Sequence, residues 1–299
     1  IQLQPDRSAE ALLADIGTPL GLSAEMSAHA VYEIVCENMA SAARVHAAER
    51  GAVIGDHTMI AFGGAAPLHA ARVAEKLGIQ RLVIPSNAGV GSAVGFLAAP
   101  VSFELVRSFP MRLDDSFNSE EVSALLDDMT QAAHGMVQDD ARTETLHIRR
   151  SAFMRYVGQG HEIIVTLPEG AISTNHLSAL RTAFETEYAR QFSRVIPHAA
   201  VEILNWSVSV STTPQKYPPF EAAPALHDAK SGDIRKLFDG ATGTHVDLPV
   251  YERTDMGPGS RISGPALIAE KETTTYVSSR YNAHLDGSGN IILDMKDAV

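Results

Sequence analysis

The sequence predicts an α/β domain, followed by an α+β segment and a small β-rich segment. A strand, a helix and a second strand follow one another between residues 59 and 85. Strand-like alternation and amphipathic helices interleave between residues 103 and 211, and short β-like stretches separated by Gly and Pro occupy the remainder. These patterns place predicted domains at 1–108, 109–213 and 214–299, the last beginning with a proline-rich linker.

The bulk composition is that of an ordinary folded protein. The 299 residues, 45% of them hydrophobic, suffice for about two domains with apolar cores. The net charge of -12 argues against binding to nucleic acid or to an anionic membrane, which requires clustered Lys and Arg. The single cysteine, Cys36, excludes an internal disulfide and fits a reducing compartment. We therefore expect a cytoplasmic protein.

The first predicted helices occupy residues 9–50. Ser23 is a good N-cap, and Gly51 is a good stop for the longer helix that follows. Apolar residues recur at roughly helical spacing between them, at Ala30, Ile34, Met39, Ala42 and Val45. Cys36 falls on a face expected to be buried, where a small core residue is a better interpretation than a nucleophile.

A βαβ unit comes next. Residues 59–62 form an apolar strand that ends at Gly63 and Gly64, and Pro67 suits the first turn of a helix that stops at Gly78. Residues 81–85 form the second strand. A strand, helix and strand this close together predict a parallel sheet with helices on its faces.

The glycine pair is the first candidate site. Gly63 and Gly64 put free backbone N–H groups at a helix N-terminus, which favours an anion or the polar edge of a ligand. A tight turn that serves packing alone is an equally good interpretation. The turn matches neither a Walker A loop nor GxGxxG. The glycine-rich loop at 87–95, with Ser92, can line the same edge of the sheet, although close helix packing explains it slightly better.

The second predicted segment carries another polar turn. Its strands and helices are expected at 103–112, 119–137, 147–157, 161–167, 177–192 and 201–211. The turn holds Gln159, His161 and Glu162, which can bind a substrate or transfer protons. An ordinary surface turn is the simpler interpretation. If His161 and Glu162 both lie on a strand, they point to opposite faces and do not act together. The histidines follow no metal-ligand spacing, so the sequence predicts no metal site.

Several runs together resemble the hydantoinase A/5-oxoprolinase family. The central ones are IAFGGAAPLHAARVAEKLGI and VIPSNAGVGSAVGFLAA, preceded by the helix YEIVCENMASAARVHAAERG. They are followed, in the order typical of that family, by RYVGQGHEI, FETEYARQFSR, VEILNWSVSV and GPALIAEKETTTYV. The resemblance covers nearly the whole chain and is specific in combination.

The resemblance implies one lobe of an actin/Hsp70-like ATPase fold. The turn would contact adenosine through Gly63, Gly64 and Ala65, with Glu33, Asn38 and Ser92 as weaker nucleotide contacts. The family uses ATP to phosphorylate an amide or carbonyl oxygen, which drives opening of a cyclic amide or carboxylation of a ketone. A hydantoinase B-type subunit is the implied partner. The resemblance leaves Gln159, His161 and Glu162 as weak candidates for a substrate or intersubunit role.

Two departures from the family pattern bear on activity. Ala66 stands where the family usually has Gly, and its methyl group narrows the expected pocket. The family's N-terminal half, with its phosphate loop and acidic Mg²⁺ ligands, has no counterpart in this sequence. ATP and Mg²⁺ are therefore expected to need that missing half, and the chain is expected to be an inactive C-terminal fragment or one subunit of a split enzyme. The alternative is a non-catalytic assembly or regulatory module that retains the fold.

Overall fold

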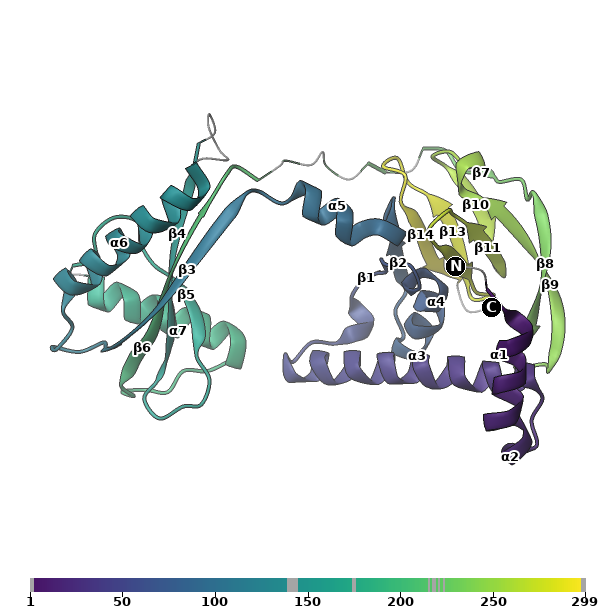
Figure 1. Ribbon diagram of the computed structural model, residues 1–299, viewed down its shortest axis with the longest axis horizontal. Coiled ribbons are helices and arrows are strands. Elements are labelled where there is room, and N and C mark those ends of the chain that lie inside the picture. Colours follow the sequence, from purple (N-terminus) through teal and green to yellow (C-terminus); the bar gives the residue numbers. More distant parts are fainter. Residues whose placement is uncertain are drawn as a thin grey trace. The chain divides into compact units, whose positions relative to one another are not determined.

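The computed structural model divides the chain into two compact units (Figure 1). It describes residues 3–138, 145–173, 176–214, 216, 219, 221–222 and 224–296. Unit 1 combines Ile1–Phe96 with Pro218–Val299, and unit 2 is Leu97–Tyr217. The mixed α/β class expected from the sequence is confirmed.

Unit 1 begins with helices. Helix α1 (Pro5–Leu12) continues through a π-helical turn (Leu13–Gly17) into the short α2 (Thr18–Leu20), and α3 (Ala24–Glu49) follows. The Oγ of Ser23 accepts a hydrogen bond of 3.2 Å from the backbone N–H of Met26. This bond satisfies one of the free N–H groups of the first turn and confirms the predicted start of α3.

Loss of the Ser23 cap is expected to weaken unit 1 modestly. Ser23→Ala leaves the Met26 N–H without its side-chain acceptor, which should lower the free energy of unfolding by about 1 kcal/mol. Denaturant titration followed by circular dichroism measures the change. Ser41→Ala is the matched control, because Ser41 is exposed within α3 and should lose no stability. Equal effects of the two variants would contradict the capping role.

A six-stranded sheet organises unit 1. Its order is β1-β2-β14-β13-β10-β7. The strands are β1 (Met59–Ile60), β2 (Arg81–Ile84), β7 (His227–Asp228), β10 (Ser260–Ser263), β13 (Tyr281–Leu285) and β14 (Ile291–Met295). Strands β1 and β2 pair in parallel with α4 (Ala66–Leu77) between them, which confirms the predicted βαβ unit.

A second sheet of unit 1 has the order β12-β11-β9-β8. Its strands are β8 (Asp233–Asp239), β9 (Thr244–Glu252), β11 (Ala266–Ala269) and β12 (Thr274–Val277). Helix α4 packs against β12 and against α3. One apolar cluster joins these elements to the six-stranded sheet, with Leu82, Ile268 and Tyr281 fully buried in it.

The grouping of segments differs from the three-part division drawn from the sequence. Strand β14 pairs antiparallel with β2, so the β-rich segment expected to be separate completes the sheet of the first segment. Arg81 and Asp294 form an ion pair of 2.6 Å across this pairing. With β1 on one side and β14 on the other, the backbone N–H and C=O groups of β2 have hydrogen-bonding strands on both sides.

Unit 2 is an antiparallel sheet packed on two helices. Its strand order is β3-β6-β4-β5, with β3 (Ser102–Arg112), β4 (His147–Tyr156), β5 (Ile163–Thr166) and β6 (Val201–Ser211). Helices α6 (Ser119–Gln138) and α7 (Leu177–Phe192) share one apolar cluster with the sheet. The indole N–H of Trp206, a fully buried member of this cluster, donates to the carbonyl oxygen of Phe109 at 2.8 Å.

Candidate functional site

The glycine turn between β1 and α4 is held on both sides. Gly63 adopts a φ of 112°, which side chains disfavour, and its N–H donates to the carbonyl oxygen of Ala88 at 2.7 Å. The carbonyl oxygen of Gly64 accepts from the Oγ1 of Thr273 at 2.8 Å. The turn is therefore fixed between the loop after β2 and the connection from β11 to β12.

The neighbouring glycines have different steric roles. A Cβ on Gly89 would lie 2.5 Å from the Cβ of Glu272, so this glycine is needed for close packing. A Cβ on Gly91 would lie 3.2 Å from the ring of Phe62. Apart from the residues next to it in the chain, the atom nearest to a Cβ on Gly64 would be the carbonyl oxygen of Glu272, at 3.8 Å, which is an ordinary van der Waals contact. The packing interpretation thus fits Gly89 and leaves Gly64 open to another role.

The first turn of α4 offers backbone donors to solvent. Ala65 is the N-cap and makes no side-chain capping bond, and Pro67 carries no N–H. Gly64 and Ala65 are exposed, and within the described residues no hydrogen bond from either N–H is recorded. Phe62, beside them, keeps 55% of its surface exposed. Free N–H groups at a helix N-terminus next to an exposed aromatic ring suit the polar and flat parts of a nucleoside.

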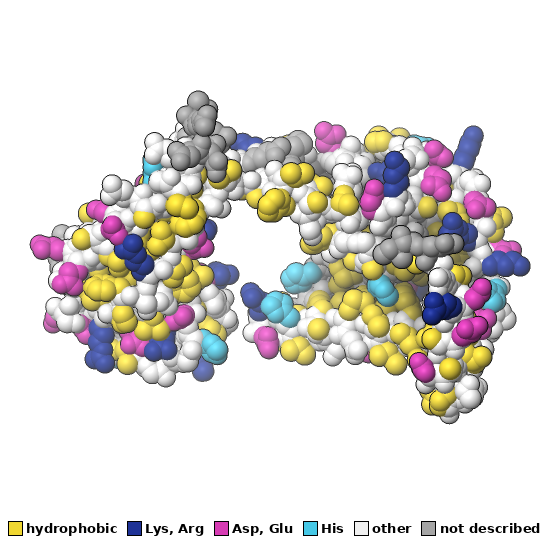
Figure 2. Space-filling model, in the orientation of Figure 1, with side chains coloured by type: hydrophobic (Ala, Val, Ile, Leu, Met, Phe, Trp, Pro, Cys, Tyr) yellow, Lys and Arg dark blue, Asp and Glu magenta, His cyan; other side chains and the backbone are white. Residues whose placement is uncertain are grey.

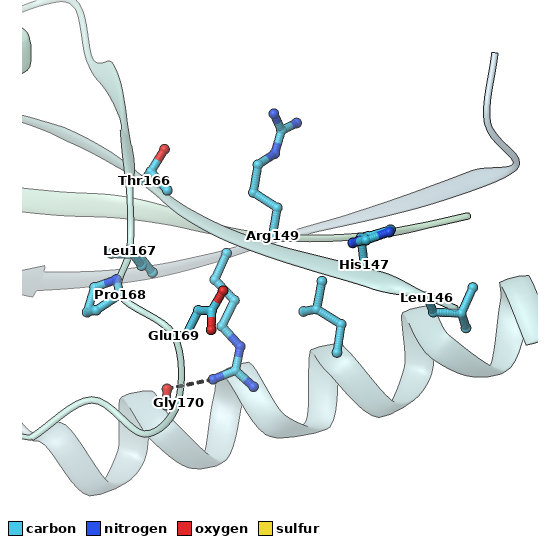
Figure 3. A pocket seen from close by; sticks show the side chains of 10 residues that line it. Leu146, His147, Arg149, Thr166, Leu167, Pro168, Glu169 and Gly170 are labelled. Atoms are coloured by element: carbon cyan, nitrogen blue, oxygen red, sulfur yellow. Dashed lines mark hydrogen bonds between the residues drawn. The ribbon is translucent and has the colours of Figure 1, made fainter. Parts of the chain in front are cut away.

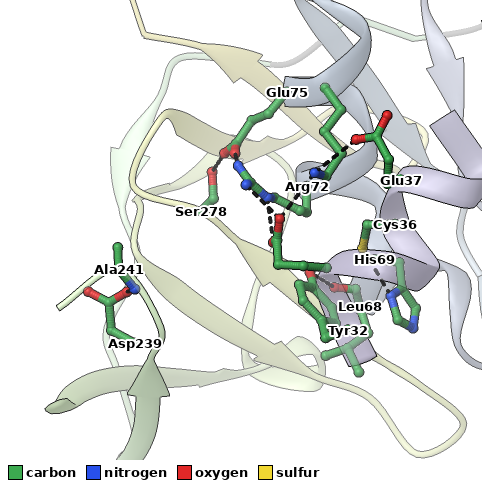
Figure 4. Close-up of polar contacts among 12 residues, drawn as sticks. Tyr32, Cys36, Glu37, Leu68, His69, Arg72, Glu75, Asp239, Ala241 and Ser278 are labelled. Carbon is green, nitrogen blue, oxygen red and sulfur yellow. Dashed lines mark hydrogen bonds and ion pairs between the residues drawn. The ribbon is translucent and has the colours of Figure 1, made fainter. Parts of the chain in front are cut away.

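The structure does not bring all the predicted nucleotide contacts together. Glu33 receives two hydrogen bonds from Arg72, at 2.7 and 2.8 Å, and an ion pair from Lys76 at 3.1 Å. Arg72 also donates a hydrogen bond of 2.9 Å to Glu75 (Figure 4). Asn38 is exposed, and its five-residue separation from Glu33 places it on a different face of α3. Ser92 is exposed on α5 (Gly91–Ala98). Contact of these three residues with a nucleotide stays a prediction.

The Glu33 ion pair is expected to make unit 1 sensitive to acid. The hydrogen bonds from Arg72 lower the pKa of Glu33 to about 2. A carboxyl group whose pKa is depressed in the folded state stabilises the fold above its unfolded pKa, and this stabilisation is lost as the pH falls toward 2. Because Arg72 is partly exposed, we expect a loss of about 1–2 kcal/mol between about pH 4.5 and pH 2.

Glu33→Gln removes the titrating group and tests this expectation. The variant should be less stable than the parent at pH 7, and the difference should shrink as the pH falls through that window. Thermal unfolding at several pH values measures it. Glu49→Gln, at the exposed end of the same helix, is the control. A constant difference across the pH range would contradict the assignment.

Cys36 lies beside His69 in the packing between α3 and α4. The thiol is fully buried, with its Sγ 3.5 Å from the Nδ1 of His69, and the ring of Tyr32 stacks on His69 at a centroid distance of 5.0 Å. Burial raises the pKa of the Cys36 thiol, which disfavours the reactive thiolate. These contacts support the interpretation of Cys36 as a core residue.

The polar turn of unit 2 is exposed. The amide Nε2 of Gln159 donates to the hydroxyl of Tyr188 at 2.8 Å, while His161 and Glu162 lie at the surface before β5. A cavity of about 500 Å³ lies at the opposite end of the β4–β5 pair (Figure 3). It is lined by 146–150 and 166–170, so none of the three predicted residues borders it. Their catalytic or intersubunit role stays a prediction.

Neither a metal centre nor a membrane span emerges from the described part of the chain. Among those residues, no group of three or more His, Cys, Asp or Glu side chains is arranged to hold a metal ion. No helix in the same ranges is both long and apolar enough to cross a bilayer.

Family models decide the assignment. The hydantoinase/oxoprolinase model matches residues 1–105, and the hydantoinase/oxoprolinase C-terminal domain model matches residues 116–298. The chain belongs to the hydantoinase/oxoprolinase family. The resemblance found in the sequence motifs is thereby confirmed.

Similar proteins in this family are longer than the chain. The caprolactamase subunit alpha of Pseudomonas jessenii is 30% identical, over 96% of the chain and 42% of its own length. The 5-oxoprolinase PfmaA of Pestalotiopsis fici is 27% identical, over 90% of the chain and 21% of its own length. The crystal structure of the ATP-dependent caprolactamase from Pseudomonas jessenii superposes with a TM-score of 0.74 and 30% identity. The match covers 99% of the present chain and 43% of the caprolactamase chain. The chain thus spans less than half of these family members.

Two residues at the glycine turn escaped the sequence reasoning. Thr273 and Glu272 contact Gly64 and Gly89 from the β11–β12 connection. Thr273 and Gly64 are 209 positions apart, so spacing gives no hint of the contact. The available signal was the family run GPALIAEKETTTYV, which contains both residues. Nothing in the local sequence pattern links these two residues to the turn.

Proposed function

We propose that the chain is the C-terminal part, or one subunit, of an ATP-dependent hydantoinase/oxoprolinase-type enzyme. The enzyme would phosphorylate an amide or carbonyl oxygen and so drive hydrolysis of a cyclic amide, with ketone carboxylation as the alternative reaction. The remaining A-type polypeptide and a hydantoinase B-type subunit are the proposed partners. The chain alone is expected to be inactive.

The observation that carries this proposal is the geometry at Gly64. Its Cβ position is open, and its conformation is fixed by the bond from Thr273. Gly64 and Ala65 are exposed, and among the described residues neither N–H donates a hydrogen bond. A nucleoside needs such a site, where backbone donors can be approached closely and are already oriented. Gly63, Gly64 and Ala65 would hold the nucleoside edge.

The described residues fit one part of a bound nucleotide. ATP would supply the phosphoryl group that makes the substrate oxygen a good leaving group. The backbone donors of Gly64 and Ala65 suit the nucleoside, whereas the described residues provide no acidic cluster for Mg²⁺. Phosphoryl transfer depends on charge neutralisation at the phosphates, so those contacts are assigned to the remaining polypeptide.

Reconstitution tests the proposal. The chain is combined with the remaining A-type polypeptide and with a B-type subunit, and ATP hydrolysis is followed with hydantoin, 5-oxoproline, caprolactam and acetone. Substrate-dependent ATP hydrolysis by the assembly, and none by the chain alone, is the expected result. An assembly that forms but hydrolyses no ATP with any of them favours a non-catalytic module.

A further inference from the structure

Thr273 connects two parts of unit 1 that lie far apart in the sequence. The backbone N–H of Glu270 donates to the carbonyl oxygen of Thr273 at 3.0 Å, which closes the connection between β11 and β12 into a tight turn. Thr273 is only 8% exposed, and its Oγ1 donates to the carbonyl oxygen of Gly64 at 2.8 Å. The β11–β12 connection thus reaches the glycine turn through a nearly buried hydroxyl.

This hydrogen bond holds a peptide group of the glycine turn. The carbonyl oxygen of Gly64 and the N–H of Ala65 belong to the same trans peptide, in which they point in opposite directions. Because the oxygen is directed at Thr273, the N–H is directed away from it. Ala65 is exposed, and within the described residues its N–H has no recorded hydrogen bond. Thr273 therefore fixes the direction of a donor that it does not touch.

The two glycines make such support necessary. Gly63 and Gly64 reach more backbone conformations than other residues, so the peptides that join them to their neighbours rotate easily when nothing holds them. The N–H of Gly63 is held by the carbonyl oxygen of Ala88 at 2.7 Å, and Thr273 holds the far end of the turn. A donor that is already oriented binds a ligand more tightly, because less freedom is lost on binding.

The same bond strengthens the donor electronically. A carbonyl oxygen that accepts a hydrogen bond polarises its peptide, and the attached N–H becomes a better donor. Figure 2 shows mainly apolar side chains over the region of unit 1 where Figure 1 places β1 and α4. In such surroundings, backbone N–H groups carry much of the polar recognition of a ligand.

Thr275, two residues further along, provides a comparison within the same segment. It is fully buried, and its Oγ1 has no hydrogen-bond partner among the described residues. Removal of this hydroxyl leaves no partner unsatisfied, whereas removal of the Thr273 hydroxyl frees the carbonyl oxygen of Gly64. The two threonines therefore separate a role at the turn from the general effect of a Thr→Val substitution.

We propose that Thr273 is a positioning residue of the nucleotide site, which acts through the Gly64–Ala65 peptide to aim the Ala65 N–H at the nucleoside. The Thr273 hydroxyl is committed to Gly64 and makes no contact of its own with the nucleoside. This inference rests on the proposed function and adds the residue that orients one of its donors.

Nuclear magnetic resonance of the chain alone tests the orientation without any ligand. Labelling with ¹³C at glycine carbonyls and ¹⁵N at alanine amides gives correlated signals only from Gly–Ala pairs, of which the chain has four. In Thr273→Val the Gly64–Ala65 signal should move in both dimensions, because the carbonyl loses its hydrogen bond and the amide its polarisation. Thr273→Ser keeps the hydroxyl and should leave the signal near its parental position. The other pairs, at 51–52, 170–171 and 240–241, should stay in place and show that the fold is kept.

ATP binding by the reconstituted assembly tests the consequence. Thr273→Val should raise the Kd for ATP about fivefold to tenfold, the effect of one poorly oriented hydrogen bond. Thr273→Ser and Thr275→Val should stay within about twofold of the parent. In the hydrolysis assay, Thr273→Val should raise the KM for ATP and leave kcat within about twofold, because the nucleoside is held equally in the ground and transition states. A purely structural role would lower the amount of active enzyme, and thus kcat, at an unchanged KM.

The outcomes separate this inference from the proposed activity. An assembly that binds ATP equally well with every variant keeps the proposed function and overturns the role of Thr273. The role is also overturned by an unmoved Gly64–Ala65 signal in Thr273→Val, by an equal loss of affinity in Thr275→Val, or by a fall in kcat at an unchanged KM. An unaltered assembly that binds no ATP overturns both proposals.

Discussion

Trp206→Ala is expected to destabilise unit 2 by about 3–5 kcal/mol, the usual cost of truncating a fully buried aromatic side chain. The substitution removes the largest fully buried side chain from the apolar cluster that joins the sheet to α6 and α7. It also removes the indole donor of the 2.8 Å hydrogen bond and leaves the carbonyl oxygen of Phe109 without that partner. This loss is a large fraction of the stability of a typical domain, about 5–15 kcal/mol.

Hydrogen exchange by mass spectrometry locates the effect. Peptides from β4, β6 and α7 should lose protection, while peptides from β13 and β14 in unit 1 should keep theirs, because the two cores share no residues. Met136→Ala is the control, since Met136 on α6 is 60% exposed and should change stability by less than about 0.5 kcal/mol. Uniform loss of protection across both units would contradict independent cores.

Gly64→Val is expected to weaken nucleotide binding by the complete enzyme at least about tenfold, without unfolding the chain. The new side chain projects into open space beside the N–H groups of Gly64 and Ala65, where the nucleoside is proposed to lie. The nearest recorded neighbour of the Cβ is 3.8 Å away, so the native turn has room for it. Isothermal titration with ATP, using the reconstituted assembly, measures the affinity.

Gly89→Ala is the matched comparison. Its Cβ would lie 2.5 Å from that of Glu272, so the β11–β12 connection must shift, at a cost of about 1–3 kcal/mol. Gly64→Val should therefore lose nucleotide affinity with an unchanged Tm, whereas Gly89→Ala should lose stability. If Gly64→Val lowers the Tm as much as Gly89→Ala does, the turn serves packing and the nucleotide proposal fails.

Local signals explain what the sequence could predict. The Ser23 cap, the βαβ unit around Pro67 and the alternation in unit 2 each depend on residues a few positions apart, and all were found. The pairing of β14 with β2 was not predicted, because no periodic pattern in one strand identifies the strand that it will pair with. Strands as short as β7 and β10 also lack enough residues to show alternation.

The candidate site was predictable only in part for the same reason. The sequence located Gly63 and Gly64 at a helix N-terminus, but it left packing and ligand binding equally favoured. The distinction between Gly64 and Gly89 depends on Glu272, which the fold brings in from more than 180 positions away. Likewise, Glu33 was predicted as a nucleotide contact, while the structure shows that its carboxylate already pairs with Arg72 and Lys76.

The pairing of β2 with β14 has a consequence for synthesis of the chain. Unit 2 lies between these two strands in sequence, and Arg81 and Asp294 are separated by 213 positions. A ribosome therefore delivers all of unit 2, which can fold as it emerges, while β2 still has an empty side. The nascent chain carries this unpaired strand until β14 has been translated. Protection by chaperones during that interval matters more for this chain than for one whose neighbouring strands are made in succession.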